Sequence, residues 1–383
     1  MKNFIFHNPT KYIFGKDTIK KIGGEIASFG SKKVLLVAGG GSIKKNGVYD
    51  TVIDSLKKHG IQWVELWGVR PNPVLSKVKE GIEIAKEENA DGVLAVGGGS
   101  VIDTAKAIAN GVFVDDVWKL FLRKNPLKPT KALPIYVVLT LSATGSEMNG
   151  TAVITNEEEK VKWSYRSLTN YPKVSIVDPT VQFSLPQRQT ANGGSDSLSH
   201  IIESYITGKP TDTTVYFDEG LMRSIIDNID RLMTDPSDYE ARASFAWAAT
   251  LAFNGLSLTG LGGDWAAHAI EHAISALHPD VAHGTGLAVI QPAVIMYRKK
   301  FNPDITERWA MQVWNASSTE EGVEKMREKF VSWGLPVALK ALGVTPDEWE
   351  EIAVKAIEFR PKNAWGDFTK DDVFEILKLA DIE

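Results

Sequence analysis

The chain of 383 residues contains no cysteine. Without thiols it cannot form disulfides, thiolate zinc sites or iron–sulfur clusters, and it cannot use a cysteine nucleophile. Any metal site in this protein must therefore be built from nitrogen and oxygen ligands.

Several other features are also missing. No basic block and no basic stripe interleaved with aromatic residues occurs, and the net charge is only −5, so we expect no nucleic-acid partner. No uninterrupted run of about 20 apolar residues exists, which argues against a membrane span. The opening MKNFIFHNPT has too short an apolar run for a secretory signal. These absences predict a cytoplasmic protein.

Short apolar runs alternate with helical patterns through the first half of the chain. The expected strands are 33–38, 61–66, 92–96, 134–139, 151–155 and 174–178. Such alternation predicts a parallel sheet covered by helices on both faces. The opening segment, with Phe4–Phe6 followed by Tyr12–Phe14, is expected to form a hairpin at a sheet edge that pairs with a second subunit.

The pattern changes after Asp178-Pro179. From about Ser184 onward, apolar residues recur at helical spacing, with breakers such as Lys209-Pro210 and His278-Pro279. No low-complexity linker separates the two halves. We therefore predict an α/β domain over residues 1–184 and an all-helical domain over residues 185–383.

A glycine-rich loop, Gly97–Ser100, joins the strand at 92–96 directly to a helix. Glycines allow a phosphate to approach the backbone closely, and a helix N-terminus offers free N–H groups and the positive end of the helix dipole. The loop fits neither GxGxxG nor GxxxxGK[ST]. A tight turn without a ligand therefore remains an equal alternative to a phosphate site.

Two further loops follow expected strands. Gly39–Ser42 carries no acidic residue to bind a ribose 2′-hydroxyl, and Lys44 and Lys45 come directly after it. Because a cation at this place accommodates a 2′-phosphate, the pattern favours NADP(H) over NAD(H). The alternative is that both lysines belong to a solvated helix start. Thr140–Glu147 offers hydroxyl and backbone groups for the pyrophosphate–nicotinamide part of a cofactor, or it is a plain polar loop.

Histidines cluster in the second half of the chain, where five of the seven lie. Asp196 and His200 are four residues apart, as are His268 and His272, so each pair lies on one face of a helix. A single pair of this kind is usually a helix-stabilising contact. Two pairs together with His283 in a chain without cysteine favour a metal site, with ligands suited to iron(II) or zinc and acceptable to manganese.

With these motifs in place, the chain resembles the iron-containing (group III) alcohol dehydrogenases, especially their NADPH-dependent butanol dehydrogenase and aldehyde reductase branch. The resemblance covers nearly the whole length. Its carriers are Pro71-Asn72-Pro73, Gly97–Ser100, Asp103, Lys106, Thr140–Asn149, Asp178-Pro179, Asp196, His200, His268, His272 and His283-Gly284. It implies a Rossmann-like dinucleotide-binding domain followed by an all-α metal-binding domain, and Fe²⁺, or Zn²⁺ in its place, as the metal.

The resemblance also implies roles for individual residues. The implied metal ligands are Asp196, His200, His268 and His283. His272 would lie beside the metal as a catalytic residue in proton transfer, and Asp103 would lie near the nicotinamide and the substrate, with a catalytic and a cofactor-binding role. The implied cofactor contacts are Gly39, Gly41, Ser42, Asn72, Gly98, Gly99, Ser100, Asp103, Thr140, Ser142, Thr144, Asn149 and Lys162.

Residues and resemblance together predict a metal-dependent alcohol dehydrogenase, or aldehyde reductase. It would transfer hydride between NADP(H) and small primary alcohols or aldehydes such as butanol and butanal, with the metal as Lewis acid. We also expect a homodimer. One alternative is a lyase or cyclase resembling dehydroquinate synthase, which needs several cationic residues around its substrate, whereas the helical stretches around His200 and His268 are largely apolar. A non-catalytic metal or nucleotide binder is the other.

Overall fold

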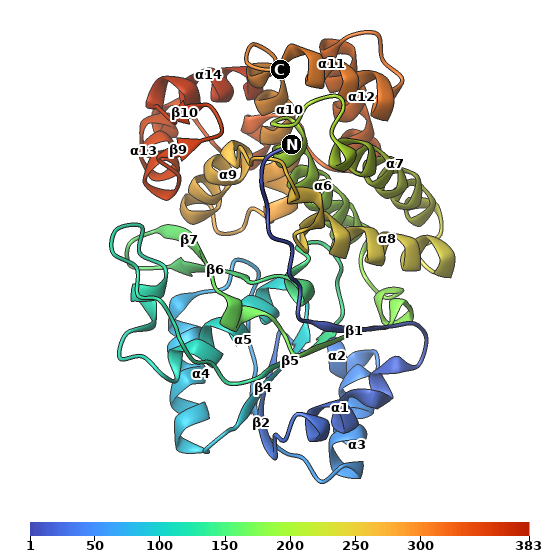
Figure 1. The fold of residues 1–383 in the computed structure, drawn as a ribbon, viewed down its shortest axis with the longest axis vertical. Coiled ribbons are helices and arrows are strands. Elements are labelled where there is room, and N and C mark those ends of the chain that lie inside the picture. Colours follow the sequence, from blue (N-terminus) through green and yellow to red (C-terminus); the bar gives the residue numbers. More distant parts are fainter. Residues whose placement is uncertain (383) are drawn as a thin grey trace. The chain divides into compact units, whose positions relative to one another are not determined.

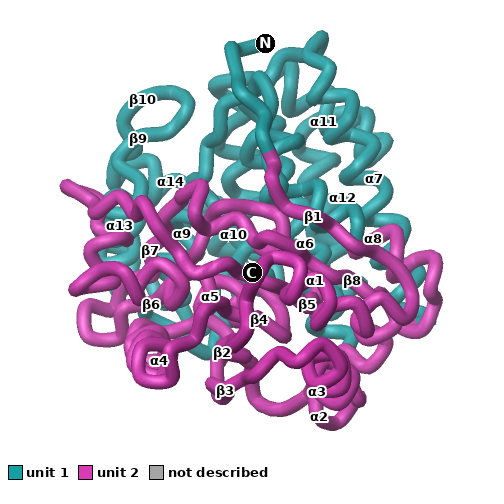
Figure 2. The backbone as a smooth tube through the Cα atoms, turned by 60° about the horizontal axis from the view of Figure 1, so that its bottom comes forward, with its two compact units in different colours: residues 1–7, 186–235, 247–383 teal, residues 8–185, 236–246 magenta. Residues whose placement is uncertain are grey.

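A computed structural model describes residues 1–382 and divides into two compact units (Figure 2). Unit 2 comprises Asn8–Leu185 and Pro236–Ala246, and unit 1 comprises Met1–His7, Pro186–Asp235 and Trp247–Glu383. The first seven residues therefore group with the helical part of the chain, and the segment 236–246 groups with the α/β part.

Unit 2 is built on a sheet of six parallel strands in the order β1-β8-β5-β4-β2-β3. Figure 1 labels β1, β5, β4 and β2 of this sheet. The strands are β1 (Lys11–Phe14), β2 (Lys33–Ala38), β3 (Gln62–Leu66), β4 (Gly92–Gly97), β5 (Ile135–Leu139) and β8 (Val174–Val177). The helices are α1 (Ile22–Ser28), α2 (Ser42–Lys45), α3 (Val48–Lys58), α4 (Leu75–Glu87) and α5 (Gly99–Gly111). The predicted α/β fold class is confirmed.

Alternation along the central strands explains how both faces of the sheet are covered. Leu35 and Val37 of β2 belong to one buried cluster, which also contains residues of α4 and α5. Val34 and Leu36 belong to the other, together with residues of α1 and α3. Because successive side chains of a strand point to opposite faces, a continuous apolar run requires helices on both sides.

The strand order places a topological switch point between β2 and β4. From β2 the chain continues to β3 at one edge, and it then returns to form β4 on the other side of β2. Connections from β2 and β4 therefore leave the sheet in opposite directions. Ligands of open α/β sheets bind at such a point, outside the carboxyl ends of the strands.

Two strand predictions are corrected by the structure. The expected N-terminal hairpin is absent: β1 pairs in parallel with β8, and residues 4–6 lie in no strand. The apolar residues of β1 are accommodated beside β8, so they need no hairpin partner. The expected strand at 151–155 is also not part of the main sheet. It forms an antiparallel hairpin of β6 (Thr151–Asn156) with β7 (Val161–Arg166), and β6 packs against α5.

Unit 1 is mainly helical. Its helices are α6 (Gln187–Tyr205), α7 (Thr213–Thr234), α9 (Ala266–Leu277), α10 (His283–Arg298), α11 (Pro303–Trp314), α12 (Thr319–Ser332), α13 (Trp349–Phe359) and α14 (Lys370–Ala380), and α8 (Tyr239–Phe253) ends in it. A short pair of strands, β9 (Lys362–Asn363) and β10 (Gly366–Asp367), follows α13. Helix α10 packs against α6, α9, α12 and α14. Among residues 1–382, no helix combines the length and the hydrophobicity that a membrane span requires.

The contact between α6 and α10 is unusually close at one glycine. A Cβ atom on Gly284 would lie 2.2 Å from the carbonyl oxygen of Asn192. Only glycine therefore lets the first turn of α10 rest on the backbone of α6. This contact brings His283, the first residue of α10, close to the middle of α6.

Candidate metal centre and cofactor loops

The Asp196 carboxylate lies at the centre of the histidine cluster in unit 1. Its Oδ1 atom is 3.3 Å from His200 Nδ1, 3.9 Å from His268 Nε2 and 3.7 Å from His283 Nε2. Helix α6 supplies Asp196 and His200, α9 supplies His268, and α10 begins with His283. The structure thus brings together all four residues that the sequence suggested as ligands.

The four side chains are not equivalent. Ligand atoms of Asp196, His268 and His283 all lie within 4.8 Å of one another. The His200 ring lies at the edge of this group and stacks on Phe253, with ring centroids 4.4 Å apart. His200 is therefore held by stacking on one side and by the proximity of Asp196 on the other.

Three atoms of this cluster are buried without a hydrogen-bond partner among the described residues: Asp196 Oδ1, His200 Nδ1 and His268 Nε2. Buried polar atoms in proteins are nearly always paired, so converging unpaired atoms require an explanation. Imidazole nitrogens and a carboxylate oxygen are donors that suit iron(II) and zinc. A divalent cation therefore fits the residues present.

The local electrostatics also favour a cation. Burial lowers the pKa of His200 to about 4, so this imidazole is neutral at pH 7. Burial opposes ionisation of Asp196, but the nearby imidazoles, that of His200 above all, lower its pKa to about 2. Burial opposes a charge on His268 as well, yet the carboxylates of Glu203 and Asp196 raise its pKa to about 9.

Two glutamates that were not predicted from the sequence contact histidines of the cluster at the ring nitrogen that does not face Asp196. His268 Nδ1 is hydrogen-bonded to Glu203, and His283 Nδ1 is hydrogen-bonded to Glu271. Both carboxylates are fully buried. Their spacing could have indicated that they share a helix face with the ligand candidates. Glu203 follows Asp196 by seven residues on α6, and Glu271 follows His268 by three on α9.

His272 lies beside the cluster on α9 and is buried. Its ring is 5.4 Å from that of His283 and 4.8 Å from that of Phe359, measured between centroids. Ligand atoms of Glu271, His272 and His283 also lie within 4.8 Å of one another. This position is next to the candidate ligands, as expected, and the proton-transfer role remains a prediction.

Trp265 and Phe253 form an aromatic wall at the start of α9. Trp265 has a φ of 61°, in the left-handed region that residues other than glycine rarely adopt. Its ring centroid lies 5.2 Å from that of Phe253 and 5.5 Å from that of His268. Backbone strain of this kind collects at functional sites, where the surroundings hold it in place.

The glycine loops of unit 2 lie at the carboxyl ends of three neighbouring strands, β2, β4 and β5. Gly39–Ser42 follows β2, Gly98–Ser100 follows β4, and Thr140–Asn149 follows β5. Helix α5 starts at Gly99 without a side-chain cap, which leaves its first N–H groups for a ligand. A Cβ atom on Gly99 would lie 2.5 Å from Thr144 Oγ1, so two of the loops touch there.

Several predicted cofactor residues also form hydrogen bonds inside unit 2, and their cofactor role stays a prediction. Asp103 accepts hydrogen bonds from Ser146 Oγ at 2.5 Å and from the Val153 backbone N–H at 3.0 Å. Ser142 Oγ accepts a hydrogen bond from Gln182, and Asn149 Oδ1 accepts one from a lysine. Their side chains hold the loop after β5 in place. By contrast, Gly98, Ser100, Thr140 and Thr144 are only partly buried.

Asn72 and Lys162 are brought together from distant parts of the sequence. Lys162 Nζ donates a hydrogen bond to Asn72 Oδ1 at 2.9 Å, and both side chains are buried. Asn72 has a φ of 51°, so the turn at Pro71-Asn72-Pro73 is left-handed at its centre. The pair ties this turn to the hairpin of β6 and β7.

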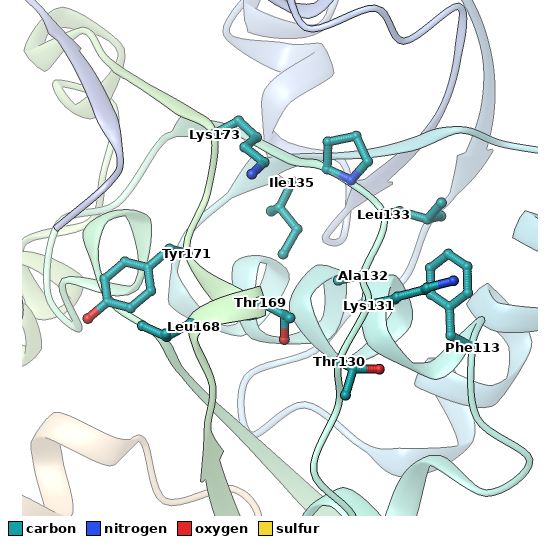
Figure 3. Close-up of a pocket in the computed structure, with 11 residues that line it drawn as sticks. Phe113, Thr130, Lys131, Ala132, Leu133, Ile135, Leu168, Thr169, Tyr171 and Lys173 are labelled. Atoms are coloured by element: carbon teal, nitrogen blue, oxygen red, sulfur yellow. The ribbon is translucent and has the colours of Figure 1, made fainter. Parts of the chain in front are cut away.

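A separate cavity of about 320 Å³ in unit 2 is not part of either site (Figure 3). Ile135, the first residue of β5, lines it, so it lies at the amino ends of the strands, away from the glycine loops. Figure 3 shows Lys131 beside Phe113 and Lys173 on another side. The two cations do not converge, and no candidate residue lines this cavity.

Comparisons with known proteins agree with this arrangement. Residues 9–179 match the family "Iron-containing alcohol dehydrogenase", and residues 190–380 match "Fe-containing alcohol dehydrogenase family, C-terminal". A probable NADH-dependent butanol dehydrogenase of Bacillus subtilis is 41% identical over 99% of this chain and 100% of its own. The NADPH-dependent aldehyde reductase of Escherichia coli is 35% identical over 90% of both chains. The crystal structure of an NADH-dependent butanol dehydrogenase A from Thermotoga maritima superposes with a TM-score of 0.96 and 48% identity, covering 100% of this chain and 99% of that one.

A parallel sheet with glycine loops at its carboxyl edge and a histidine–carboxylate cluster are the features expected of a metal- and nicotinamide-dependent oxidoreductase. The chain belongs to the iron-containing, NAD(P)-dependent alcohol dehydrogenase family. The predicted resemblance and the predicted enzyme class are thereby confirmed.

Proposed function

We propose that Asp196, His200, His268 and His283 bind Fe²⁺, with Zn²⁺ able to replace it, and that the enzyme interconverts small primary alcohols and aldehydes such as butanol and butanal. One observation carries the metal site: Asp196 Oδ1 lies between 3.3 and 3.9 Å from three imidazole nitrogens, in a buried cluster with unpaired atoms. The substrate class is supported by the butanol dehydrogenases and the aldehyde reductase among the relatives.

A divalent metal held by Asp196, His200, His268 and His283 would supply Lewis acidity toward the substrate oxygen, and a nicotinamide held at the glycine loops would supply the hydride chemistry. The chain's own residues prepare this chemistry. Asp196 Oδ1 and one ring nitrogen of each of the three imidazoles face one another, while the rings of Phe253 and Trp265 lie beside His200 at one side of the cluster. His272, beside His283, is the side chain we assign to proton transfer at a ring nitrogen.

We propose NADP(H) as the preferred cofactor. The loop after β2 has no carboxylate between Gly39 and Ser42 that could bind a ribose 2′-hydroxyl. Gly41 in this loop has a φ of 101°, in the left-handed region. The nearby acid on β3, Glu65, accepts hydrogen bonds from Tyr49, Trp63 and Trp67. Its oxygens are therefore occupied and compete poorly for ribose hydroxyls.

Lys44 is the cation that would attract a 2′-phosphate in this region. Its Nζ lies 4.0 Å from the centroid of the Trp67 ring, which holds the ammonium near the end of β2. The Lys44→Met variant should lose kcat/KM with NADPH more than with NADH. Lys58→Met, on an exposed lysine of α3, is the control. Equal losses with both cofactors would contradict NADP(H) preference.

The metal proposal is tested by elemental analysis together with butanal-dependent oxidation of NADPH. His268→Ala should lose both bound metal and turnover, because it removes one of four ligands. His278→Ala is the matched control, since His278 bonds to Glu348 away from the cluster. Full activity of a metal-free preparation, or stoichiometric metal in His268→Ala, would overturn the proposal. Consumption of one NADPH per aldehyde reduced separates this reaction from that of a lyase.

We also propose a homodimer. The N-terminal segment of unit 1 exposes Phe4, Ile5 and Phe6, with exposed fractions of 52%, 97% and 47%. Adjacent exposed apolar residues of this size commonly mark an interface. Light scattering on the wild type and on Ile5→Glu measures the oligomeric state. A wild-type dimer that Ile5→Glu weakens supports the proposal, and a wild-type monomer contradicts it.

A further inference from the structure

We infer that Glu203 and Glu271 are positioning residues that orient two histidines toward the metal, and that they act in series along the helices. Glu203, on α6, holds His268 of α9, and Glu271, on α9, holds His283 of α10. Helix α6 thus carries the carboxylate that fixes the histidine of α9, and α9 carries the carboxylate that fixes the histidine of α10. The inference rests on the metal site proposed above.

Glu203 connects α6 to the start of α9 through three contacts. One oxygen accepts hydrogen bonds from the backbone N–H groups of Ala267 at 2.6 Å and His268 at 3.4 Å, and the other contacts His268 Nδ1. The N-cap residue of α9, Trp265, provides no side-chain cap. Glu203 therefore caps α9 from a neighbouring helix, in addition to orienting the His268 ring.

Glu271 connects α9 to the first residue of α10. Its carboxylate contacts His283 Nδ1, and its side chain lies against Gly286, one turn further along α10. A Cβ atom on Gly286 would lie 2.8 Å from Glu271 Cγ. Glycine at this position leaves the space that Glu271 needs between the two helices.

A carboxylate at Nδ1 determines which imidazole nitrogen remains available. It accepts the Nδ1 proton, which fixes the tautomer and leaves the lone pair on Nε2. In both histidines Nε2 is the atom that faces Asp196 Oδ1, at 3.9 Å for His268 and 3.7 Å for His283. His200 differs, because its own Nδ1 faces Asp196 and its ring is held by Phe253.

The experiment measures the affinity of the purified protein for Co²⁺ and Zn²⁺ by competition with a chelator, and the visible d–d spectrum of the Co²⁺ form. Glu203→Gln and Glu271→Gln keep an oxygen acceptor and lose the charge, whereas Glu203→Ala and Glu271→Ala lose both. We expect metal affinity to fall roughly 10–100-fold in the alanine variants, less in the glutamine variants, with an altered Co²⁺ spectrum.

Glu219→Gln and Glu219→Ala are the matched controls. Glu219 is a buried carboxylate of the same unit that bonds to Arg308 and Tyr205 instead of to a histidine. These controls should lose fold stability and keep wild-type metal affinity. If Glu203→Ala does not fold, Gly286→Ala tests the positioning role at Glu271. This variant displaces the Glu271 side chain and removes no ligand or charge, so it should also weaken metal binding.

The outcomes separate this inference from the metal proposal. Wild-type metal affinity in the Glu203 and Glu271 variants, with metal lost in Asp196→Ala, would overturn the positioning role alone. Wild-type affinity in Asp196→Ala would overturn the metal site itself. If metal affinity falls equally in the Glu219 controls, general destabilisation accounts for the effect, and Glu203 and Glu271 have no positioning role.

Discussion

Lys106 is a buried cation whose removal should disturb both the stability of unit 2 and its cofactor loop. Its Nζ donates hydrogen bonds to Ser146 Oγ at 2.7 Å, to Asn149 Oδ1 at 3.2 Å and to the Thr151 carbonyl at 2.8 Å. Its side chain is 0% exposed. The Lys106→Met variant keeps most of the volume and removes the charge and all three donated bonds.

The magnitude follows from what remains buried after the substitution. Asp103, which is itself buried and lies one turn before Lys106 on α5, loses the cation that offsets its charge. The hydrogen bonds donated by Lys106 are lost as well, and this loss costs roughly 3–5 kcal/mol in all, because a hydrogen bond to a charged donor contributes on the order of 1.5–3 kcal/mol and Met leaves the buried acceptors unpaired. We expect the free energy of unfolding to fall by about this amount, a large part of the roughly 5–15 kcal/mol of a typical protein.

NADPH binding should weaken together with the stability of unit 2. Ser146 and Asn149 belong to the loop after β5, so losing their bonds to Lys106 should loosen that loop and weaken NADPH binding, measured by nucleotide fluorescence. Urea unfolding of Lys106→Met and of the control Lys79→Met, an exposed lysine of α4, measures the stability. A loss below about 1 kcal/mol with unchanged NADPH affinity would show that Lys106 does not hold the loop after β5.

The stability that depends on Lys106 should also change with pH. Burial lowers the pKa of Lys106 to about 8 from its ordinary 10.5, although Asp103 and Glu147 oppose the shift. Because the folded state binds this proton less readily than the unfolded state, the stability linked to it is present above 10.5 and is lost as pH falls through 8. The difference in unfolding free energy between wild type and Lys106→Met should therefore grow from pH 8 toward 10, and parallel curves would contradict it.

Two further predictions concern packing around the sites. Gly99→Ala should cost about 1–3 kcal/mol by overpacking against Thr144, and adding Thr144→Ala should restore part of it; urea unfolding of Gly99→Ala that matches the wild type would contradict the contact. Arg298→Met should cost roughly 3–5 kcal/mol, because Arg298 forms two hydrogen bonds of 3.0 Å with the buried Asp264. Thermal unfolding checks this, and an unchanged midpoint would show that Asp264 needs no buried cation.

Local pattern was sufficient for much of the fold and for part of the candidate site. Buried strands such as β2 and β4 are continuous apolar runs, and their spacing by helices predicts a parallel sheet. The glycine loops could be placed together because the carboxyl ends of parallel strands share one edge. Asp196 and His200 could be paired because four residues make about one helical turn.

Packing between distant segments decided what local pattern could not. The pair His268 and His272 has the same spacing, yet His268 faces Asp196 while the His272 ring lies against Phe359. Asp103 and Asn149 match a cofactor motif, and only the folded chain shows that both also form hydrogen bonds that hold the loop after β5. Periodicity shows which residues share a face of a helix or strand, but it does not show which other segment packs against that face.

Local sequence pattern was enough to predict the central strands of the sheet, the helical second half and the nitrogen and oxygen character of any metal site, and the family resemblance supplied the four ligand candidates. Only the tertiary structure decided the strand order, the parallel placement of β1 beside β8, and the contacts of Glu203 and Glu271. Such contacts join segments far apart in the chain: Glu203 and the histidine it holds are separated by 65 positions in the sequence, so their contact depends on how α6 and α9 pack.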